Sequence, residues 1–136
     1  MGRRRKAREL ALQLLYELDL RGGEEAGQAA AEFWRRQEVP EEVRTFADTI
    51  VRGTTAHRGK IDELISGFAE RWDLERMAVV DRNIVRAGIF ELLWADDVPP
   101  KVAINEALEI ARKFSTAQST RFINGLLDRV RRELLP

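Results

Sequence analysis

The segment DDVPPKVAINEALEIARKF, residues 96–114, contains the sharpest break in the chain and one of the helical patterns that decide its fold class. Because proline disfavours helix in the residue before it, Pro99 and Pro100 predict that the preceding helix ends near Ala95. A new helix is then expected over about residues 101–114. The side chains expected on its inner face include Val102, Ala103 and Ile110.

Helical spacing of apolar residues continues on both sides of this segment, and no alternating strand pattern competes with it. Leu10, Leu14 and Leu18 predict an amphipathic helix from Ala7 to the Arg21-Gly22-Gly23 break. Further helices are expected over about residues 24–37, 40–57, 60–69, 77–95 and 118–134. We therefore predict an all-α fold of about seven short helices, packed as two small helical subdomains.

The length and composition predict one domain over residues 1–136. With 44% hydrophobic residues, the chain has enough apolar material for a single core. No uncharged apolar run approaches the roughly 18 to 20 residues that span a bilayer. An export signal is not expected, because Glu9, Glu17 and Asp19 interrupt the apolar stretch that follows the basic start. Together with the lack of cysteine, these features fit a location in the cytoplasm.

Positive charge is concentrated at the start of the chain. The 23 basic and 23 acidic residues cancel, but five cations precede the first acidic residue, so the rest of the chain sums to 0 − 5 = −5. We call these five residues the basic cluster: Arg3, Arg4, Arg5, Lys6 and Arg8. Such a cluster on the first turns of a helix can bind phosphates, and arginine also stacks on bases, which makes RNA a natural ligand. A solvated terminus without a ligand is the alternative.

Other polar residues within the helices are open to two interpretations. Tyr16 and Gln13 follow the basic cluster and can stack on and read unpaired bases, although the edge of the core is the commoner place for such a tyrosine. Asn105 either contacts a ligand or bridges to a neighbouring helix. Gly125 costs about 1 kcal/mol of helix propensity relative to alanine. We therefore expect a close helix contact at Gly125, supported by Asn124.

Patterns typical of enzymes are missing from the sequence. There is no cysteine, and the single histidine, His57, has no nucleophile or metal-binding partner at a useful spacing. Glycine-rich phosphate loops and nucleophile elbows are also missing. Paired acids are expected at helix ends or turns, where they favour the helix dipole and solubility, at Glu24-Glu25, Glu41-Glu42 and Asp96-Asp97. We therefore expect no catalysis, no metal and no cofactor.

Several segments, in their order and spacing, resemble the NusB family of bacterial transcription antitermination factors. They are Arg3–Glu9, Ala11–Tyr16, Trp72–Arg82, Asp97–Ala107 and Phe122–Asp128. The resemblance covers residues 3–130 and is poorest over 22–38. It implies a helical fold of two three-helix-like subdomains, and a function in binding rather than turnover.

The resemblance also implies the partners. A member of this family is expected to bind single-stranded boxA RNA together with NusE, which is also a small-subunit ribosomal protein. On ribosomal RNA leaders this heterodimer works with other Nus factors and helps RNA polymerase resist termination. Some family members form homodimers, and the sequence does not decide between monomer and homodimer.

The site residues carry over by matching position. The resemblance implies phosphate contacts by the basic cluster and base or sugar contacts by Gln13, Tyr16, Lys101, Gln118 and Phe122. It places the NusE-facing surface on a helix that carries Glu75, Asp81 and Arg82. Gln118 departs from the family, in which an acidic residue can occur at this loop position. Losing a negative charge there is expected to favour RNA, so Gln118→Asp is expected to weaken RNA binding.

Two other functions remain as alternatives. NusB-like helical domains also occur at the front of some RNA cytosine methyltransferases, but this chain has no second domain and no strand-glycine-helix nucleotide pattern. The other alternative is a purely protein-binding helical bundle. In that case the basic cluster is inert, and neutral replacement of Arg3, Arg4 and Arg5 leaves every interaction unchanged.

Overall fold

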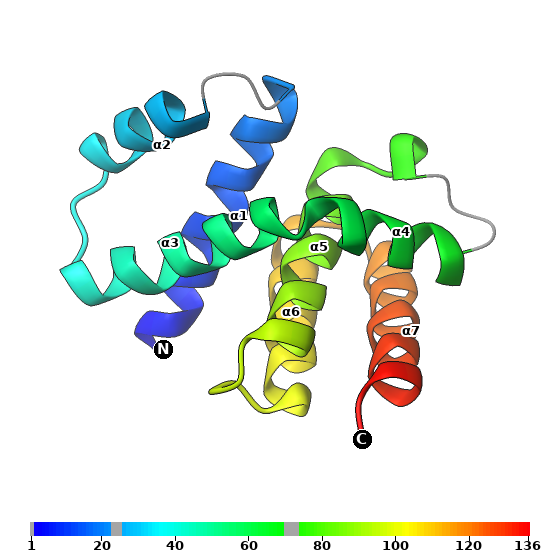
Figure 1. Cartoon of the computed structure of the whole chain (residues 1–136). Helices are drawn as coiled ribbons and strands as arrows, with labels where there is room; N and C mark the ends of the chain where they lie inside the picture. The colour runs from blue at the N-terminus through cyan, green and yellow to red at the C-terminus, as the bar shows by residue number, and fades with distance from the viewer. Residues whose placement is uncertain (1, 23–25, 70–73) are drawn as a thin grey trace.

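A computed structural model describes residues 2–22, 26–69 and 74–136, and all regular structure in these ranges is helical (Figure 1). The elements are α1 (Arg3–Leu20), α2 (Ala26–Arg35), α3 (Glu41–Ala56), α4 (Arg58–Phe68), the 3-10 helix η1 (Leu74–Arg76), α5 (Val79–Trp94), α6 (Pro100–Phe114) and α7 (Ala117–Leu134). The predicted all-α class is confirmed, with seven α-helices in the described ranges. The acidic pair Glu24-Glu25 and the residues Trp72 and Asp73 lie outside the described residues.

The helices form two groups that meet at α5. In the first group, α1 packs mainly against α3 and also contacts α2. In the second, α5, α6 and α7 pack together, with α4 crossing one end of α5 and α7 (Figure 1). Because α5 also contacts α1 and α3, it joins the two groups. No helix in the described ranges combines the length and apolar character needed to cross a membrane.

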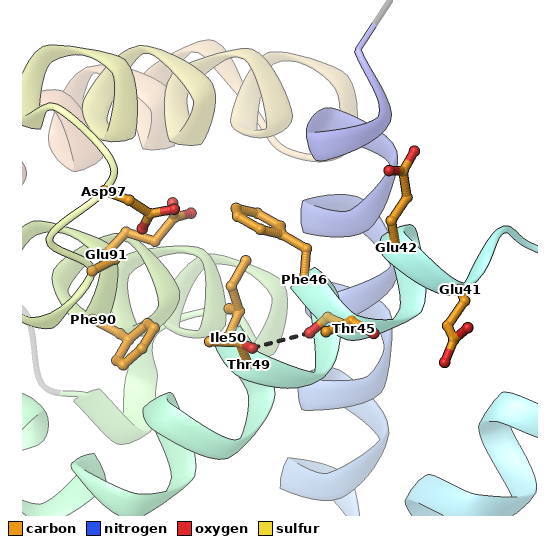
Figure 2. Close-up of a pocket in the computed structure, with 10 residues that line it drawn as sticks. Glu41, Glu42, Thr45, Phe46, Thr49, Ile50, Phe90, Glu91 and Asp97 are labelled. Atoms are coloured by element: carbon orange, nitrogen blue, oxygen red, sulfur yellow. Dashed lines mark hydrogen bonds between the residues drawn. The ribbon is translucent and has the colours of Figure 1, made fainter.

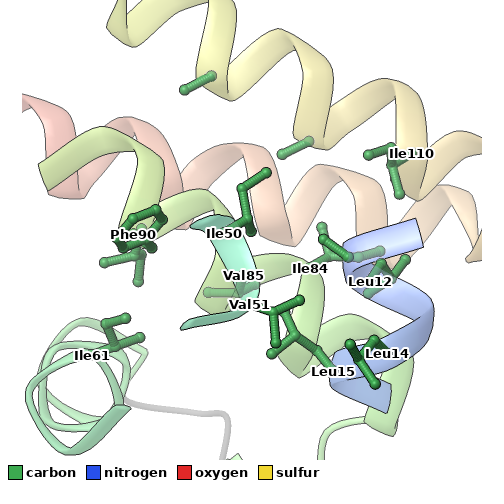
Figure 3. Close-up of a cluster of buried hydrophobic side chains, with 14 of the residues drawn as sticks. Leu12, Leu14, Leu15, Ile50, Val51, Ile61, Ile84, Val85, Phe90 and Ile110 are labelled. Atoms are coloured by element: carbon green, nitrogen blue, oxygen red, sulfur yellow. The ribbon is translucent and has the colours of Figure 1, made fainter. Parts of the chain in front are cut away.

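A single apolar core runs through both groups. Figure 3 shows Leu12 and Leu14 of α1 near Val51 of α3 and near Ile84 and Val85 of α5. All five side chains are buried. Since full burial of such an aliphatic side chain stabilises a fold by about 1.5–3 kcal/mol, the junction at α5 is a substantial part of the stability.

Several helix ends follow the local chemistry of the sequence. Pro100 occupies the first turn of α6, where its missing N–H group is not needed. The Thr116 hydroxyl caps α7 by accepting a hydrogen bond of 3.0 Å from the amide of Ser119. Gly22, just after α1, has a φ of 70°, which glycine adopts without strain. His57 lies between α3 and α4, as expected for a helix-end residue.

Helix α1 begins at Arg3, one turn earlier than the predicted start at Ala7. The apolar pattern does not reveal this turn, because its residues are charged. Ion pairs to three other segments hold it in place: Arg3 to Glu42, Arg4 to Asp97 and Arg5 to Glu106. Tertiary contacts therefore extend the helix beyond its apolar pattern.

An ionic network centred on Asp19 fastens α1 and α4 to α5. Arg82 donates two hydrogen bonds to Asp19, of 2.7 and 2.8 Å, and Asn83 donates another of 2.9 Å. Arg86 bridges Asp19 at 3.0 Å and Asp62 at 2.8 and 3.1 Å. Burial alone would raise the pKa of Asp19, but the hydrogen bonds from Arg82 and Asn83 and the charge of Arg86 lower it to about 2.

The close helix contact expected at Gly125 is wrong. A Cβ atom added there would meet nothing within 4 Å, and Gly125 and Asn124 are both exposed. The tight helix approaches occur instead at Gly53, which lies against the ring of Phe90, and at Gly88, which lies against a leucine of α7. The spacing of apolar residues along one helix does not show which glycine faces a neighbour.

Candidate RNA-binding surface

The basic cluster lies on the first two turns of α1, and its members differ in what they contact. Arg3, Arg4 and Lys6 are exposed. Arg3 pairs with a glutamate of α3, and Arg4 donates a 3.1 Å hydrogen bond to an aspartate of the α5–α6 turn. Lys6 forms no ion pair with the part of the chain that the structure describes. These three cations can therefore reach a bound phosphate.

Arg5 and Arg8 are held inside the protein. Arg5 donates hydrogen bonds of 2.6 and 3.1 Å to Glu106, which lower the pKa of that carboxyl. Arg8 is buried and donates to both oxygens of Glu91, over 2.7 and 2.9 Å. The phosphate contact expected of Arg8 stays a prediction, and in the RNA-free protein its guanidinium compensates a buried carboxylate instead of facing solvent.

A groove of about 550 Å³ lies beside the basic cluster. Lys6, Gln13 and Tyr16 line it from α1, and Val80 and Phe114 line it from α5 and α6. Tyr16 is 39% exposed and Phe114 is 47% exposed. Since stacking on an aromatic side chain contributes about 1–3 kcal/mol per base, the groove can hold unpaired bases next to phosphate-binding cations.

Phe114 is a candidate that the sequence does not single out. In the sequence it marks only the end of the helix predicted over residues 101–114. The structure exposes its ring and places the ammonium nitrogen of Lys113 5.2 Å from the ring centroid. Its position directly before the Ser115 turn was the available signal, because side chains at helix ends often leave the core.

Ion pairs connect α1 to α6 and to the turn that precedes α6. They join Arg4 to Asp97, Arg5 to Glu106 and Glu9 to Lys113. Lys101, exposed on the first turn of α6, therefore lies at the end where the basic cluster begins. Val102 beside it is 45% exposed, so its expected inward position is wrong.

Gln118 and Phe122 lie at the other end of α6, on the first turns of α7. Gln118 is exposed and Phe122 is partly buried. At a rise of 1.5 Å per residue, α6 separates Lys101 from this end by roughly 20 Å. The structure therefore distributes the expected RNA residues along a strip formed by α1, α6 and the start of α7, rather than gathering them in one pocket.

The expected partner-facing residues lie on two elements, not on one helix. Glu75 belongs to η1 and is exposed, while Asp81 and Arg82 belong to α5. Asp81 is buried and accepts a hydrogen bond from the hydroxyl of Ser115. Arg82 is engaged with Asp19. The prediction that the three residues share one helix is therefore wrong, while their role toward a partner stays a prediction.

Comparison with known proteins decides the family. Residues 5–132 match the NusB family. The chain belongs to this family. The NusB antitermination protein of Koribacter versatilis is 48% identical over 98% of this chain and 91% of its own length.

Solved NusB structures have the same fold. NusB of T. maritima superposes with a TM-score of 0.88 at 35% identity, covering 100% of this chain and 94% of that one. A structure of the antitermination factors NusB and NusE in complex with dsRNA superposes with a TM-score of 0.82 at 25% identity, covering 97% of this chain and 98% of that one. The helical arrangement is therefore that of NusB proteins.

Proposed function

We propose that this protein is a transcription antitermination factor that binds boxA RNA of nascent ribosomal RNA transcripts together with the ribosomal protein NusE. With other Nus factors, the complex helps RNA polymerase resist termination. The observation that carries the proposal is a NusB-family fold in which exposed Lys6 of the basic cluster lines a groove together with Tyr16 and Phe114. The NusB–NusE–dsRNA complex with the same fold supports both partners.

The proposed RNA is single-stranded, although the solved relative is described with dsRNA. Tyr16 and Phe114 expose ring surface at the groove, and bases can stack on such rings only when they are unpaired. Arg3, Arg4 and Lys6 are the proposed phosphate contacts, with Arg5 at their edge. The proposed base or sugar contacts are Gln13, Tyr16, Lys101, Gln118 and Phe122.

The proposed activity is binding without turnover, by one domain over residues 1–136, in the cytoplasm. Relatives named as antitermination proteins along nearly their whole length support this proposal. For NusE, we propose a surface that includes exposed Glu75, with Asp81 and Arg82 supporting the start of α5 from inside.

The test is fluorescence anisotropy of a labelled boxA-like single-stranded RNA, with and without the cognate NusE, against a scrambled RNA at matched salt. We expect selective binding of boxA RNA that becomes tighter with NusE. Equal, weak binding of both RNAs in both conditions would leave a protein-binding bundle as the better account.

A further inference from the structure

Two acidic residues hold the exposed arginines of α1 in the RNA-free protein. Arg3 pairs with Glu42, and Arg4 donates to Asp97 over 3.1 Å. The guanidinium carbon of Arg4 also lies 4.6 Å from the centroid of the Phe46 ring. All four charged side chains are more than half exposed, so solvent and ligands can reach both pairs.

The two carboxylates belong to the rim of a groove of about 550 Å³ between α3 and α5. In Figure 2, Glu42 points toward the first turns of α1, whereas its neighbour Glu41 points the opposite way. Asp97 and the ring of Phe46 face each other across the groove (Figure 2). Glu42 and Asp97 are thus directed at the arginines proposed to bind phosphate.

We propose that Glu42 and Asp97 compete with RNA phosphates for Arg3 and Arg4 and thereby set the RNA affinity of this surface. The inference rests on the proposed RNA binding. A carboxylate and a phosphate accept from the same guanidinium donors, so each arginine must release its carboxylate before it can present a bidentate pair of N–H groups to phosphate.

The other arginines of the cluster show why only these two pairs exchange. Arg8 and Glu91 are both buried, and separating them would leave two uncompensated charges away from water. The Arg5 pair is three-quarters buried or more on both sides. Exposed ion pairs are weak, because water and salt compete with them. The cluster therefore consists of a fixed inner part and an exchangeable outer part.

The chain provides matched controls for this proposal. Glu41 and Asp96 directly precede Glu42 and Asp97, are also exposed, and form no ion pair with the described residues. Neutralising either pair of acids removes the same charge from nearly the same place. Only Glu42→Gln with Asp97→Asn releases the arginines, whereas Glu41→Gln with Asp96→Asn does not.

The experiment measures the dissociation constant of the boxA-like RNA for the parent and both double variants at matched salt. Since an exposed ion pair changes an equilibrium by about 1.5- to 5-fold, releasing both is expected to tighten RNA binding by about 2- to 25-fold relative to the control variant. In an Arg3→Gln, Arg4→Gln background this gain should vanish. Thermal unfolding of each variant checks that the fold is retained.

Each result has a defined meaning. Equal affinities of the two double variants overturn the competition, and weaker binding by the Glu42→Gln, Asp97→Asn variant shows that the acids position the arginines for RNA instead. A gain that persists without Arg3 and Arg4 also overturns it. If the parent selects no boxA RNA, with or without NusE, the proposed function fails and the competition fails with it.

Discussion

Arg3 and Arg8 lie little more than one turn apart on α1 and carry the same charge, yet their surroundings give them different roles. The Arg3 side chain is 68% exposed, whereas that of Arg8 is 6% exposed and pairs with a glutamate that is 5% exposed. A guanidinium at the surface can exchange partners, while a buried one is required by the carboxylate that it compensates.

This difference predicts the stability of two alanine variants. Arg8→Ala is expected to lower the free energy of unfolding by about 3–5 kcal/mol, because it leaves Glu91 buried and unpaired. Arg3→Ala is expected to change it by less than about 1 kcal/mol. Urea unfolding of both variants checks the prediction. Similar stabilities would contradict the structural role assigned to Arg8.

Tyr16, unlike Arg8, is expected to matter for RNA binding and not for stability, because its ring is exposed in the groove beside Gln13. Tyr16→Ala is expected to weaken boxA RNA binding by about 1–3 kcal/mol through loss of stacking. Leu20→Ala, at the far end of α1 and also exposed, is the control and should leave RNA affinity unchanged. Anisotropy titrations measure the RNA affinity of both variants, and equal affinities would show that Tyr16 does not contact the RNA.

At the scale of elements, apolar spacing predicted the helices well wherever one face of a helix is buried. It missed the first turn of α1, because the residues that hold it are charged and pair with distant segments. It also missed the single turn η1, which has no buried residue. The burial of Arg8 also cannot be predicted from the neighbouring sequence, since its partner Glu91 lies 83 residues away. Residue types could suggest an RNA site, but only the tertiary structure shows which cations remain free to act.

The junction of α1, α4 and α5 has its own pH dependence. The folded pKa of Asp19, about 2, lies below its ordinary value of 3.8, so its contribution to stability is present above pH 4 and is lost as the pH falls toward 2. Asp19→Asn is therefore expected to be less stable at neutral pH, with a flatter loss of stability between about pH 5 and pH 2. Thermal unfolding across this range measures it.

Asp96→Asn, in the exposed turn before α6, is the control for this experiment. It should keep the acid profile of the parent, because Asp96 forms no ion pair with the described residues. If Asp19→Asn and the parent lost stability equally as the pH is lowered, the network on α5 would not depend on the charge of Asp19.

For the whole molecule, a net charge of zero is compatible with RNA binding because the five cations of the basic cluster are concentrated on the first two turns of α1. Within the basic cluster, Arg5 and Arg8 are paired with carboxylates at low exposure, which limits the number of phosphates that the cluster can contact. RNA binding by this protein is therefore expected to be moderately, not steeply, dependent on salt.

The number of exposed cations in the basic cluster gives the salt dependence of RNA binding a value. Binding to single-stranded RNA shows a log–log salt slope of about −0.7 per phosphate contact, so contacts by Arg3, Arg4 and Lys6 predict a slope of about −2. Five contacts by the entire basic cluster would give about −3.5. Anisotropy titrations over a series of salt concentrations distinguish the two values. A slope near −3.5 would mean that the internal pairs of Arg5 and Arg8 open on RNA.

The assignment of RNA to this surface is tested by NMR, following backbone amide shifts of the protein during titration with boxA RNA. We predict that the largest shifts follow the strip from the start of α1 and Lys101, through Gln13 and Tyr16, to Gln118 and Phe122. Shifts confined to the α2–α3 side of the molecule, with α1 and α6 unchanged, would contradict the assignment of this surface to RNA.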